Sequence, residues 1–503
     1  MVKKVSSNWE VNVGIQNRDE LVEHPTFLEN IRYFFDPIDI EHMRSVAKID
    51  LATYEGVKAN ATKIYFQTSG GSMPPPQDPA RRWPENRVKS FRNWIVDKFP
   101  VGVSPLNLAA LSLAPASAVQ VRRNAANLDK AEIAQLSAAF KTIMERDPSH
   151  PQSYFAIAGI HWFPSVPVTC MHHEPRYNPW HRIYVDRFED ALRSVPGCES
   201  IKLPYWDILA PVPEWLFEAP FDSYTLQAEA APQYPVGFKT ERNPPSQIAD
   251  GLALYDVASD IKEALNSPDF EKFTSFIESA HDGGHVSVGR AMGRPDVAAF
   301  DPIFWFFHCN WERLFWTWQR RYSATTLEEF RSTVTSTDFS WLDTPPFNSL
   351  DPFGKTTPET IATTAYAYEE ATAPLPFQDF AIVKSGNVLI DRAFRLNIEP
   401  KLSVRVKAIE RLRIAGTFVV HLIADQQSVA RRAFFQADEP QKCPNCLQRA
   451  KVNIDFIVDR SAIQGKRLEV RIETLAVDRI DPWVPLSQVG SPTINIRELL
   501  ISE

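Results

Sequence analysis

The sequence predicts a multidomain protein with a mainly α-helical core, a small helical N-terminal extension and an all-β C-terminal domain. Two observations predict this class. Apolar residues recur every three to four positions in most of residues 1–375, the spacing of an amphipathic helix, and every second position after that, the spacing of a strand. The 503 residues suggest about two to four domains, and a hydrophobic content of 44% is enough for a core in each.

The composition argues against several classes of partner. The net charge is -8, the isoelectric point is near 5.9, and no block of lysine and arginine stands out, so we expect no nucleic acid or anionic membrane as a partner. The N-terminus lacks an apolar signal segment, and no window approaches a membrane-spanning length, so we expect a cytoplasmic protein. Five cysteines are too few for a disulfide scaffold.

Residues 1–110 are predicted to form the helical N-terminal extension. Helical spacing occurs in residues 38–49, 51–68 and 84–99, and the proline-rich segment 69–84 predicts a loop. No cofactor motif is found here. The segment therefore suits a plain helical extension or an oligomerisation element, and a homo-oligomer is one expectation for this chain.

Residues 111–375 contain most of the histidines, because eight of the 11 fall between His150 and His308. In one group, His161 ends a helical run, His172 and His173 lie in a proline-bounded loop, and His181 begins an amphipathic helix. Clustered imidazoles in loops and at helix starts are typical of a metal site.

A second group consists of His281, His285 and His308. The first two are four residues apart and would share a helix face, and the third lies in residues 301–322, which are apolar on nearly every side. A buried imidazole must be hydrogen-bonded or serve as a ligand. Sites made only of imidazoles favour copper, zinc or iron over calcium or magnesium.

The segment HDGGH, residues 281–285, also invites comparison with zinc proteases. Those enzymes need a glutamate as general base directly after the first histidine, on a continuous helix. Here that position is Asp282, and Gly283 and Gly284 each cost on the order of 1 kcal/mol in a helix. The protease interpretation is therefore disfavoured.

Both histidine groups resemble the type 3 copper proteins, the tyrosinases and polyphenol oxidases. His172, eight intervening residues, and PWHR with His181 resemble their CuA region; the pair 281/285, GRAMGRP and FDPIFWFFHCNWER resemble their CuB region. The resemblance covers about 150 residues and implies a four-helix bundle that holds two copper ions. It implies these ligands: His161, His172 and His181 for CuA, and His281, His285 and His308 for CuB.

The same resemblance implies roles for neighbouring residues. His173 competes with His172 for the second CuA position, but the spacing to His181 favours His172 and leaves His173 as a surface or outer-sphere group. Cys170 lies where fungal-type members join a cysteine to that histidine ring by a thioether, which would fix the imidazole orientation.

The chain departs from the family pattern at two places. Phe307 replaces a histidine that usually precedes the last CuB ligand, and Trp311, Glu312 and Arg313 replace the usual VDR. None of these positions is a ligand, so we expect copper binding to persist. Phe304, one turn before His308, is expected to pack on the ligand rings.

The implied reaction uses O2 to hydroxylate phenols at the ortho position and to oxidise o-diphenols to o-quinones, with small phenols as substrates. A phenol has a pKa near 10 and must lose its proton, so a nearby carboxylate helps as a general base. Glu278 matches a glutamate of fungal-type members, and Asp282 stands where the family often has asparagine. Two close carboxylates should raise one pKa.

Three further residues are expected to shape the approach to the site. Pro295, thirteen residues before His308, lies where many members place a residue that gates the substrate approach. Arg294 and Val286 are near enough in sequence to line the same pocket.

Residues 376–503 are predicted to form a small sandwich or barrel, since segments such as 402–409, 418–424 and 451–458 alternate apolar and polar residues. This domain resembles the C-terminal shield that covers the copper site in latent enzymes. Cys443 and Cys446 form a CxxC that resembles a copper-delivery element; a local disulfide or plain packing remains an alternative. Tyr366 and Tyr368 resemble a family motif that pairs with Arg122 or Arg123.

Three alternatives to a tyrosinase remain open at this stage. A catechol oxidase or an o-aminophenol oxidase would use the same ligands without strong activity on monophenols. A hemocyanin-like oxygen carrier would bind O2 reversibly at the same dicopper site.

Overall fold

A computed structural model describes residues 19–27, 30–35, 37–47, 49–71, 73, 81–101, 120–164, 170–335, 339–362, 366–371, 375–376, 401–476 and 481–498. The chain divides into two compact units: residues 1–114 with 320–324, and residues 115–319 with 325–503. The predicted boundary between residues 110 and 111 lies outside the described residues, and the one after residue 375 stays a prediction.

The N-terminal unit is helical, as the apolar spacing indicates. Its elements are η1 (Ile31–Phe34), α1 (Pro37–Val46), α2 (Tyr54–Ala59), α3 (Ala61–Ser69) and α4 (Glu85–Val96). The segment 51–68 forms two helices because the chain breaks at Asn60, which ends α2 and begins α3. Aromatic side chains such as Phe91 and Trp94 fill the core of this unit.

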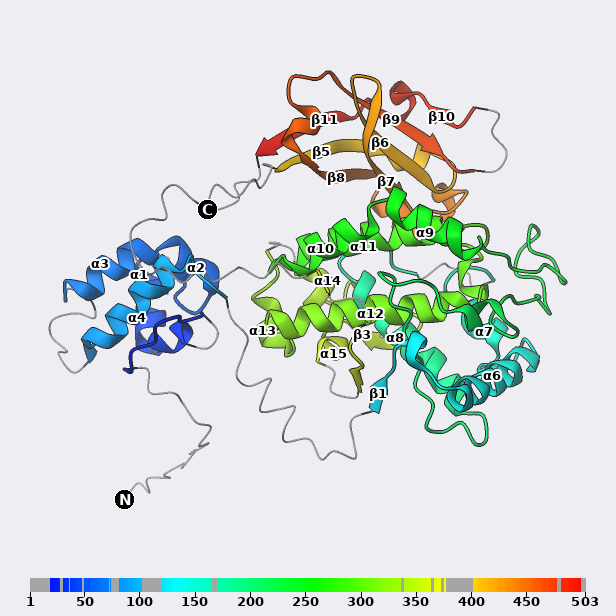
Figure 1. Cartoon of the computed structure of the whole chain (residues 1–503), viewed down its shortest axis with the longest axis horizontal. Coiled ribbons are helices and arrows are strands. Elements are labelled where there is room, and N and C mark those ends of the chain that lie inside the picture. The colour runs from blue at the N-terminus through cyan, green and yellow to red at the C-terminus, as the bar shows by residue number, and fades with distance from the viewer. Residues whose placement is uncertain are drawn as a thin grey trace. The chain divides into compact units, whose positions relative to one another are not determined.

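The second unit contains a mainly helical core (Figure 1). Its longer helices are α6 (Lys130–Glu145), α8 (Tyr177–Arg193), α9 (Pro245–Leu254), α10 (Val257–Leu265), α11 (Phe270–Val288) and α12 (Ile303–Arg321). Its short helices are η3 (Ala125–Asn127), α7 (Tyr154–Ala158), η4 (Glu214–Phe217), η5 (Ala298–Phe300), α13 (Leu327–Arg331), α14 (Ser340–Asp343) and α15 (Pro358–Ile361). Its short strands are β1 (Gln120–Arg122), β2 (Ser349–Leu350), β3 (Lys355–Thr356) and β4 (Tyr366–Tyr368).

Helices α11 and α12 form the buried centre of this core. From Ile303 to Phe315 every residue of α12 is buried, as its almost wholly apolar sequence predicts. Helix α11 packs against α9, α10 and α8, so its histidine face looks into the protein. Helix α8 begins at Tyr177, one turn before His181, and Pro179 is tolerated because it lies in the first turn.

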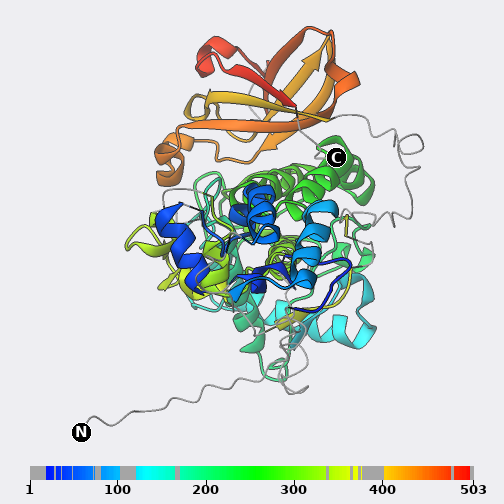
Figure 2. The ribbon, with the colours of Figure 1, turned by 90° about the vertical axis from the view of Figure 1, so that its left-hand side faces the viewer.

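The C-terminal residues form a β domain, coloured yellow to red in Figures 1 and 2. Its elements are β5 (Lys401–Glu410), η6 (Arg411–Arg413), β6 (Phe418–Ala424), β7 (Gln427–Phe434), η7 (Pro440–Lys442), α16 (Pro444–Gln448), β8 (Lys451–Asp459), α17 (Arg460–Ile463), β9 (Leu468–Thr474), β10 (Trp483–Val484), η8 (Leu486–Val489) and β11 (Thr493–Glu498).

These strands form two antiparallel sheets, with strand orders β10-β9-β6-β7 and β11-β5-β8. Inward-facing residues of both sheets, such as Val404, Phe418 and Phe456, share one hydrophobic core. The alternating pattern predicted five of these seven strands, β5, β6, β8, β9 and β11. It did not predict the two-residue β10, nor β7, in which Arg431 and Arg432 interrupt the alternation. Strand β7 packs against α11, so one of the two missed strands meets the helical core.

Among the described residues, no helix combines the length and apolar character needed to cross a membrane.

Candidate functional site

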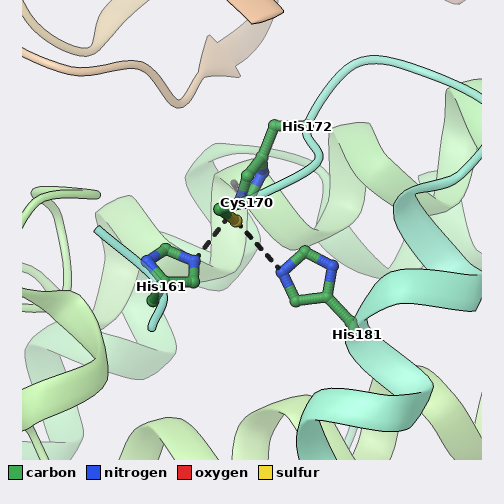
Figure 3. A group of neighbouring side chains, drawn as sticks. All are labelled: His161, Cys170, His172 and His181. Carbon is green, nitrogen blue, oxygen red and sulfur yellow. Dashed lines mark hydrogen bonds between the residues drawn. The ribbon is translucent and has the colours of Figure 1, made fainter. Parts of the chain in front are cut away.

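The first histidine group converges as the sequence predicts (Figure 3). His161 follows α7, His172 lies in the loop after the segment 165–169, and His181 extends from the first turn of α8. All three side chains are buried. Nε2 of His161 lies 3.4 Å from Nε2 of His172, and one ligand atom from each of these residues and Cys170 falls within 4.8 Å of the others.

The second group is equally compact. His281 and His285 lie one turn apart on α11, and His308 faces them from α12. Each of the three side chains is fully buried, and their ligand atoms also lie within 4.8 Å of one another. Every histidine that the resemblance assigned as a ligand therefore falls into its expected triad.

The two triads lie against each other and form a single cluster. The rings of His181 and His308 stack with centroids 4.7 Å apart and an interplanar angle of 12°. The rings of His172 and His281 have centroids 5.2 Å apart. This arrangement would place two metal ions next to each other.

The ring nitrogens show which atoms are available to a metal. Four rings use Nδ1 in a hydrogen bond within the protein: His161 with Pro295 O (2.9 Å), His181 with Tyr177 O (2.9 Å), His281 with Asp282 Oδ1 (3.0 Å) and His285 with Met292 O (2.7 Å). Such bonds fix the tautomer and point Nε2 toward a metal.

Several buried nitrogens have no hydrogen-bond partner among the described residues. They are Nε2 of His281 and His285, both ring nitrogens of His308, and Nδ1 of His172. Leaving a buried polar atom unpaired costs about 1–3 kcal/mol. Nε2 of His281, Nε2 of His285 and one ring nitrogen of His308 therefore fit metal coordination.

Burial also keeps these imidazoles neutral. It lowers the pKa of His161 from 6.5 to about 4. Burial, reinforced by neighbouring imidazoles, lowers the pKa of the other five ligand candidates well below the usual value. A neutral ring keeps the lone pair that a metal requires.

Glu278 and Asp282 both lie at the cluster, on the face of α11 that carries His281. Oε1 of Glu278 accepts the backbone N–H of His173 and lies 3.7 Å from Nδ1 of His172. Burial raises the pKa of Glu278, and burial followed by the charge of Glu278 raises the pKa of Asp282. Repulsion between the two carboxylates was the predicted cause of one raised pKa, but desolvation is the larger cause for both groups.

Helix α11 remains continuous through Gly283 and Gly284. A Cβ at Gly284 would lie 2.7 Å from Cε2 of Phe307, and one at Gly283 would lie 3.0 Å from Cβ of Tyr255. The two glycines therefore let neighbouring side chains approach the helix closely, which accounts for their presence between two candidate ligands.

The residues matched to the common central domain of tyrosinase contain both triads. That family model matches residues 151–250 and 220–321. The part of the chain that holds both triads, residues 151–321, is thus similar to the type 3 copper family of tyrosinases and hemocyanins. That family implies two copper ions, and the two groups of histidines are consistent with them.

Individual type 3 copper proteins are similar to parts of the chain. Hemocyanin 2 of Megathura crenulata is 30% identical over 225 residues, which cover 40% of this chain and 6% of that protein. A tyrosinase of Aspergillus oryzae is 22% identical over 446 residues, covering 59% of this chain and 80% of that protein. The structure of a tyrosinase from Burkholderia thailandensis has a TM-score of 0.53 at 20% identity, covering 76% of this chain and 100% of that one.

The similarity covers only part of the length of these relatives. The first relatives are hemocyanins, and the chain spans between 6% and 55% of their length. Both tyrosinases and hemocyanins occur among the relatives, so the similarity does not distinguish oxidation of phenols from oxygen carriage.

Cys170 is a buried free thiol within the first triad. Its Sγ lies 3.7 Å from Nε2 of His181 (Figure 3). The sulfur therefore lies among the imidazole rings of the first triad. The thioether to His172 stays a prediction.

The predicted pocket residues occupy different positions. Phe304 packs on the ligand rings as expected, with its centroid 4.1 Å from that of His308 and 5.1 Å from that of His161. Pro295 is buried, and its carbonyl oxygen accepts from His161. Val286 is half-buried on α11. Arg294 pairs with Asp438 of the β domain at 2.6 Å, so it contacts that domain.

Phe435 lies at the histidine cluster, which the sequence interpretation missed. It directly follows β7, is almost completely buried, and stacks on His285 with centroids 4.0 Å apart and an angle of 13°. Its neighbour Phe434 stacks on His173 at 3.8 Å. An aromatic pair at the end of a strand carries no signal for these contacts, because the contact partners lie more than 100 residues away.

One of the two expectations for His173 placed it at the surface, and the structure contradicts that expectation. Its side chain is 12% exposed, and Nε2 bonds to Phe435 O at 3.0 Å. The β domain thus covers the loop beside the first triad. Arg432 adds a buried ion pair between β7 and α10, with Nη2 2.7 Å from Asp260 Oδ1.

Cys443 and Cys446 form a disulfide, one of the alternatives that the sequence left open. Both are buried and pack with Trp162, the residue after His161. In this form neither sulfur is a thiolate that could bind Cu(I), so the predicted copper-delivery role would require reduction.

The expected tyrosine contact is made by Arg122. Strands β1 and β4 pair in parallel, and Nη1 of Arg122 donates to the hydroxyl of Tyr368 at 2.9 Å. The same guanidinium pairs with Glu189 and with Glu312, which keeps the carboxylate of the altered WER segment inside the core. Arg313 of that segment pairs with Asp207 at 3.3 Å, while Trp311 contacts the ring of Phe307.

Proposed function

We propose that this chain is a dicopper phenol oxidase of the tyrosinase type. It would use O2 to hydroxylate monophenols at the ortho position and to oxidise o-diphenols to o-quinones. The supporting observation is the pair of facing histidine triads, whose neutral rings leave buried nitrogens without a protein partner. Two copper ions bound there would supply the O2 binding and the two-electron redox chemistry.

In this proposal each triad holds one copper ion: His161, His172 and His181 hold CuA, and His281, His285 and His308 hold CuB. The finer fold description belongs to the same proposal: α6, α8, α11 and α12 as the four-helix bundle, and the two sheets as a sandwich. A thioether between Cys170 and His172 would hold one CuA ring in place.

The acidic residues of the site would handle the substrate proton. Glu278 is buried, and its Oε1 lies 3.7 Å from Nδ1 of both His172 and His173, so its carboxylate would be near a phenol bound beside the first triad. A raised pKa makes a carboxylate a stronger base toward a phenol, whose own pKa is near 10. Asp282 would act beside it, either on the proton or through His281.

The β domain would act as a shield in this scheme. The ring of Phe435 covers His285, and Phe304 packs from the opposite element, α12. A planar phenol would need the space that Phe435 fills. We therefore propose that the described arrangement is a latent form and that displacement or cleavage near residue 375 admits substrate.

The runner-up function is reversible oxygen carriage. Hemocyanins are among the relatives, with similarity over 225 and 240 residues of two of them. A catechol oxidase or an o-aminophenol oxidase would differ only in substrate preference. Action in the cytoplasm on small phenols, without nucleic acid or membrane partners, belongs to the main proposal, as does a homo-oligomer through the N-terminal helices.

The test is to load the full chain with copper, count the ions, and assay tyrosine, catechol and 2-aminophenol before and after limited proteolysis near residue 375. We expect two copper ions per chain and quinone formation from catechol that increases after cleavage. His308→Ala is the matched control and should lose copper and activity together. Reversible O2 binding without quinone formation would favour the oxygen carrier.

A further inference from the structure

Asp282 accepts hydrogen bonds from two directions at once. Oδ1 lies 3.0 Å from Nδ1 of His281, on the same helix. Oδ2 accepts the backbone N–H of Phe435, from the β domain, at 3.0 Å. The carboxylate is almost completely buried, so water does not replace either bond.

The first bond determines how His281 meets a metal. Its Nε2 has no hydrogen-bond partner among the described residues, while Nδ1 faces Asp282. For Nε2 to offer a lone pair, the neutral ring must carry its proton on Nδ1 and donate it to Oδ1. The other bonded rings use backbone carbonyls for this purpose, so His281 alone depends on a side chain.

The second bond fixes the backbone of Phe435 over the site. The N–H of Phe435 is held by Asp282, and its carbonyl accepts from Nε2 of His173. Both polar backbone atoms of this residue therefore bind groups next to the two triads, while its ring stacks on His285.

We propose that Asp282 is a positioning residue that makes metal binding at His281 compatible with docking of the β domain. This inference rests on the proposed dicopper function. A carboxylate has two acceptor oxygens and can serve both donors, whereas an amide has only one. The acid at this position therefore allows the metal site to be filled while the shield is closed.

The substitution Asp282→Asn separates the two bonds. Without metal, the amide oxygen can accept from Phe435 while the amide N–H donates to Nδ1 of His281. With metal on Nε2, Nδ1 must carry the proton, so the amide oxygen turns to His281 and its NH2 group faces the N–H of Phe435. Metal binding should then weaken docking in this variant.

The experiment follows hydrogen exchange of the Phe435 amide in the full chain, with and without copper(I) under argon. In the wild type we expect the amide to stay protected in both states. In Asp282→Asn we expect copper(I) to lower protection by about threefold to tenfold, the range that one hydrogen bond supplies. In Asp282→Ala the protection should be low in both states, because no acceptor remains.

Asp455→Asn is the matched control. Asp455 pairs with Arg405 at 2.6 Å inside the β domain. In this variant the Phe435 amide should therefore exchange as it does in the wild type, with and without copper(I). Asp282→Glu retains two acceptor oxygens and should restore the copper-independent protection.

The proposal is overturned if Asp282→Asn responds to copper(I) as the wild type does, or if Asp282→Ala keeps wild-type protection. The second comparison holds even if the asparagine variant does not fold. Failure of the dicopper site would look different, because the wild-type chain would then not take up two copper ions, and failure of the oxidase function alone would show as two bound copper ions without quinone formation from catechol.

Discussion

Replacing Phe435 with alanine should speed oxidation of catechol by the intact, copper-loaded chain. The Phe435 ring stacks on the ring of His285 with centroids 4.0 Å apart. Its centroid lies 5.6 Å from that of His172 and 5.9 Å from that of His281. It therefore occupies the space directly over the second triad. The substitution removes this cover but leaves the six histidines unchanged.

The magnitude follows from the buried area. A phenylalanine ring buries on the order of 150 Å², worth about 4 kcal/mol at about 25 cal/mol per Å². Part of this lost free energy lowers the stability of the β domain itself, so we assign about one quarter, roughly 1 kcal/mol, to the packing of the β domain on the helical core. A loss of this size raises the ratio of molecules with an uncovered site to molecules with a covered site by about fivefold.

The assay is the initial rate of quinone formation from catechol without protease, at equal copper content. We expect at least a fivefold increase for Phe435→Ala. Phe435→Tyr keeps a stacked ring and should keep the low rate. The shield interpretation is refuted if the alanine variant is no faster than the wild type while proteolysis near residue 375 still activates both.

Three further predictions concern stability. Gly284→Ala should destabilise the fold by about 1–3 kcal/mol, because its Cβ would lie 2.7 Å from Cε2 of Phe307. A thermal unfolding midpoint equal to that of the wild type would contradict this. Arg122→Met should cost up to about 3–5 kcal/mol in denaturant unfolding, since it removes a buried cation shared by Glu189 and Glu312 and leaves them paired with Lys202, Arg193 and Arg182; a neutral result would contradict it. The metal-free protein should lose stability as the pH falls from 6.5 to about 4, because burial lowers the pKa of His161 and the unfolded chain binds the proton that the folded chain excludes. His161→Phe should reduce this loss in unfolding scans across that range, and an unchanged profile would contradict the assignment.

The histidine triads could be predicted because their chemistry is visible in local sequence. His281 and His285 share a helix face at four-residue spacing, and the apolar surroundings of His308 leave a buried imidazole with few alternatives to a ligand role. The alternating pattern likewise revealed β5, β6 and β8.

The cover of the site could not be predicted in the same way. Phe435 and Asp282 are 153 positions apart, and their hydrogen bond depends on how the β domain packs against α11. Nor does the sequence show that Asp282 faces a ligand ring and a backbone N–H at once. Such contacts follow from tertiary packing, which residue spacing does not encode.

The most direct test of the central claim is metal analysis of the copper-loaded chain together with catechol turnover. The proposed site predicts two copper ions per chain, loss of copper in His308→Ala, and conversion of catechol to o-quinone with consumption of O2. A chain that binds a single zinc ion in preference to copper, or that binds two copper ions yet never oxidises catechol after the shield is removed, would contradict it.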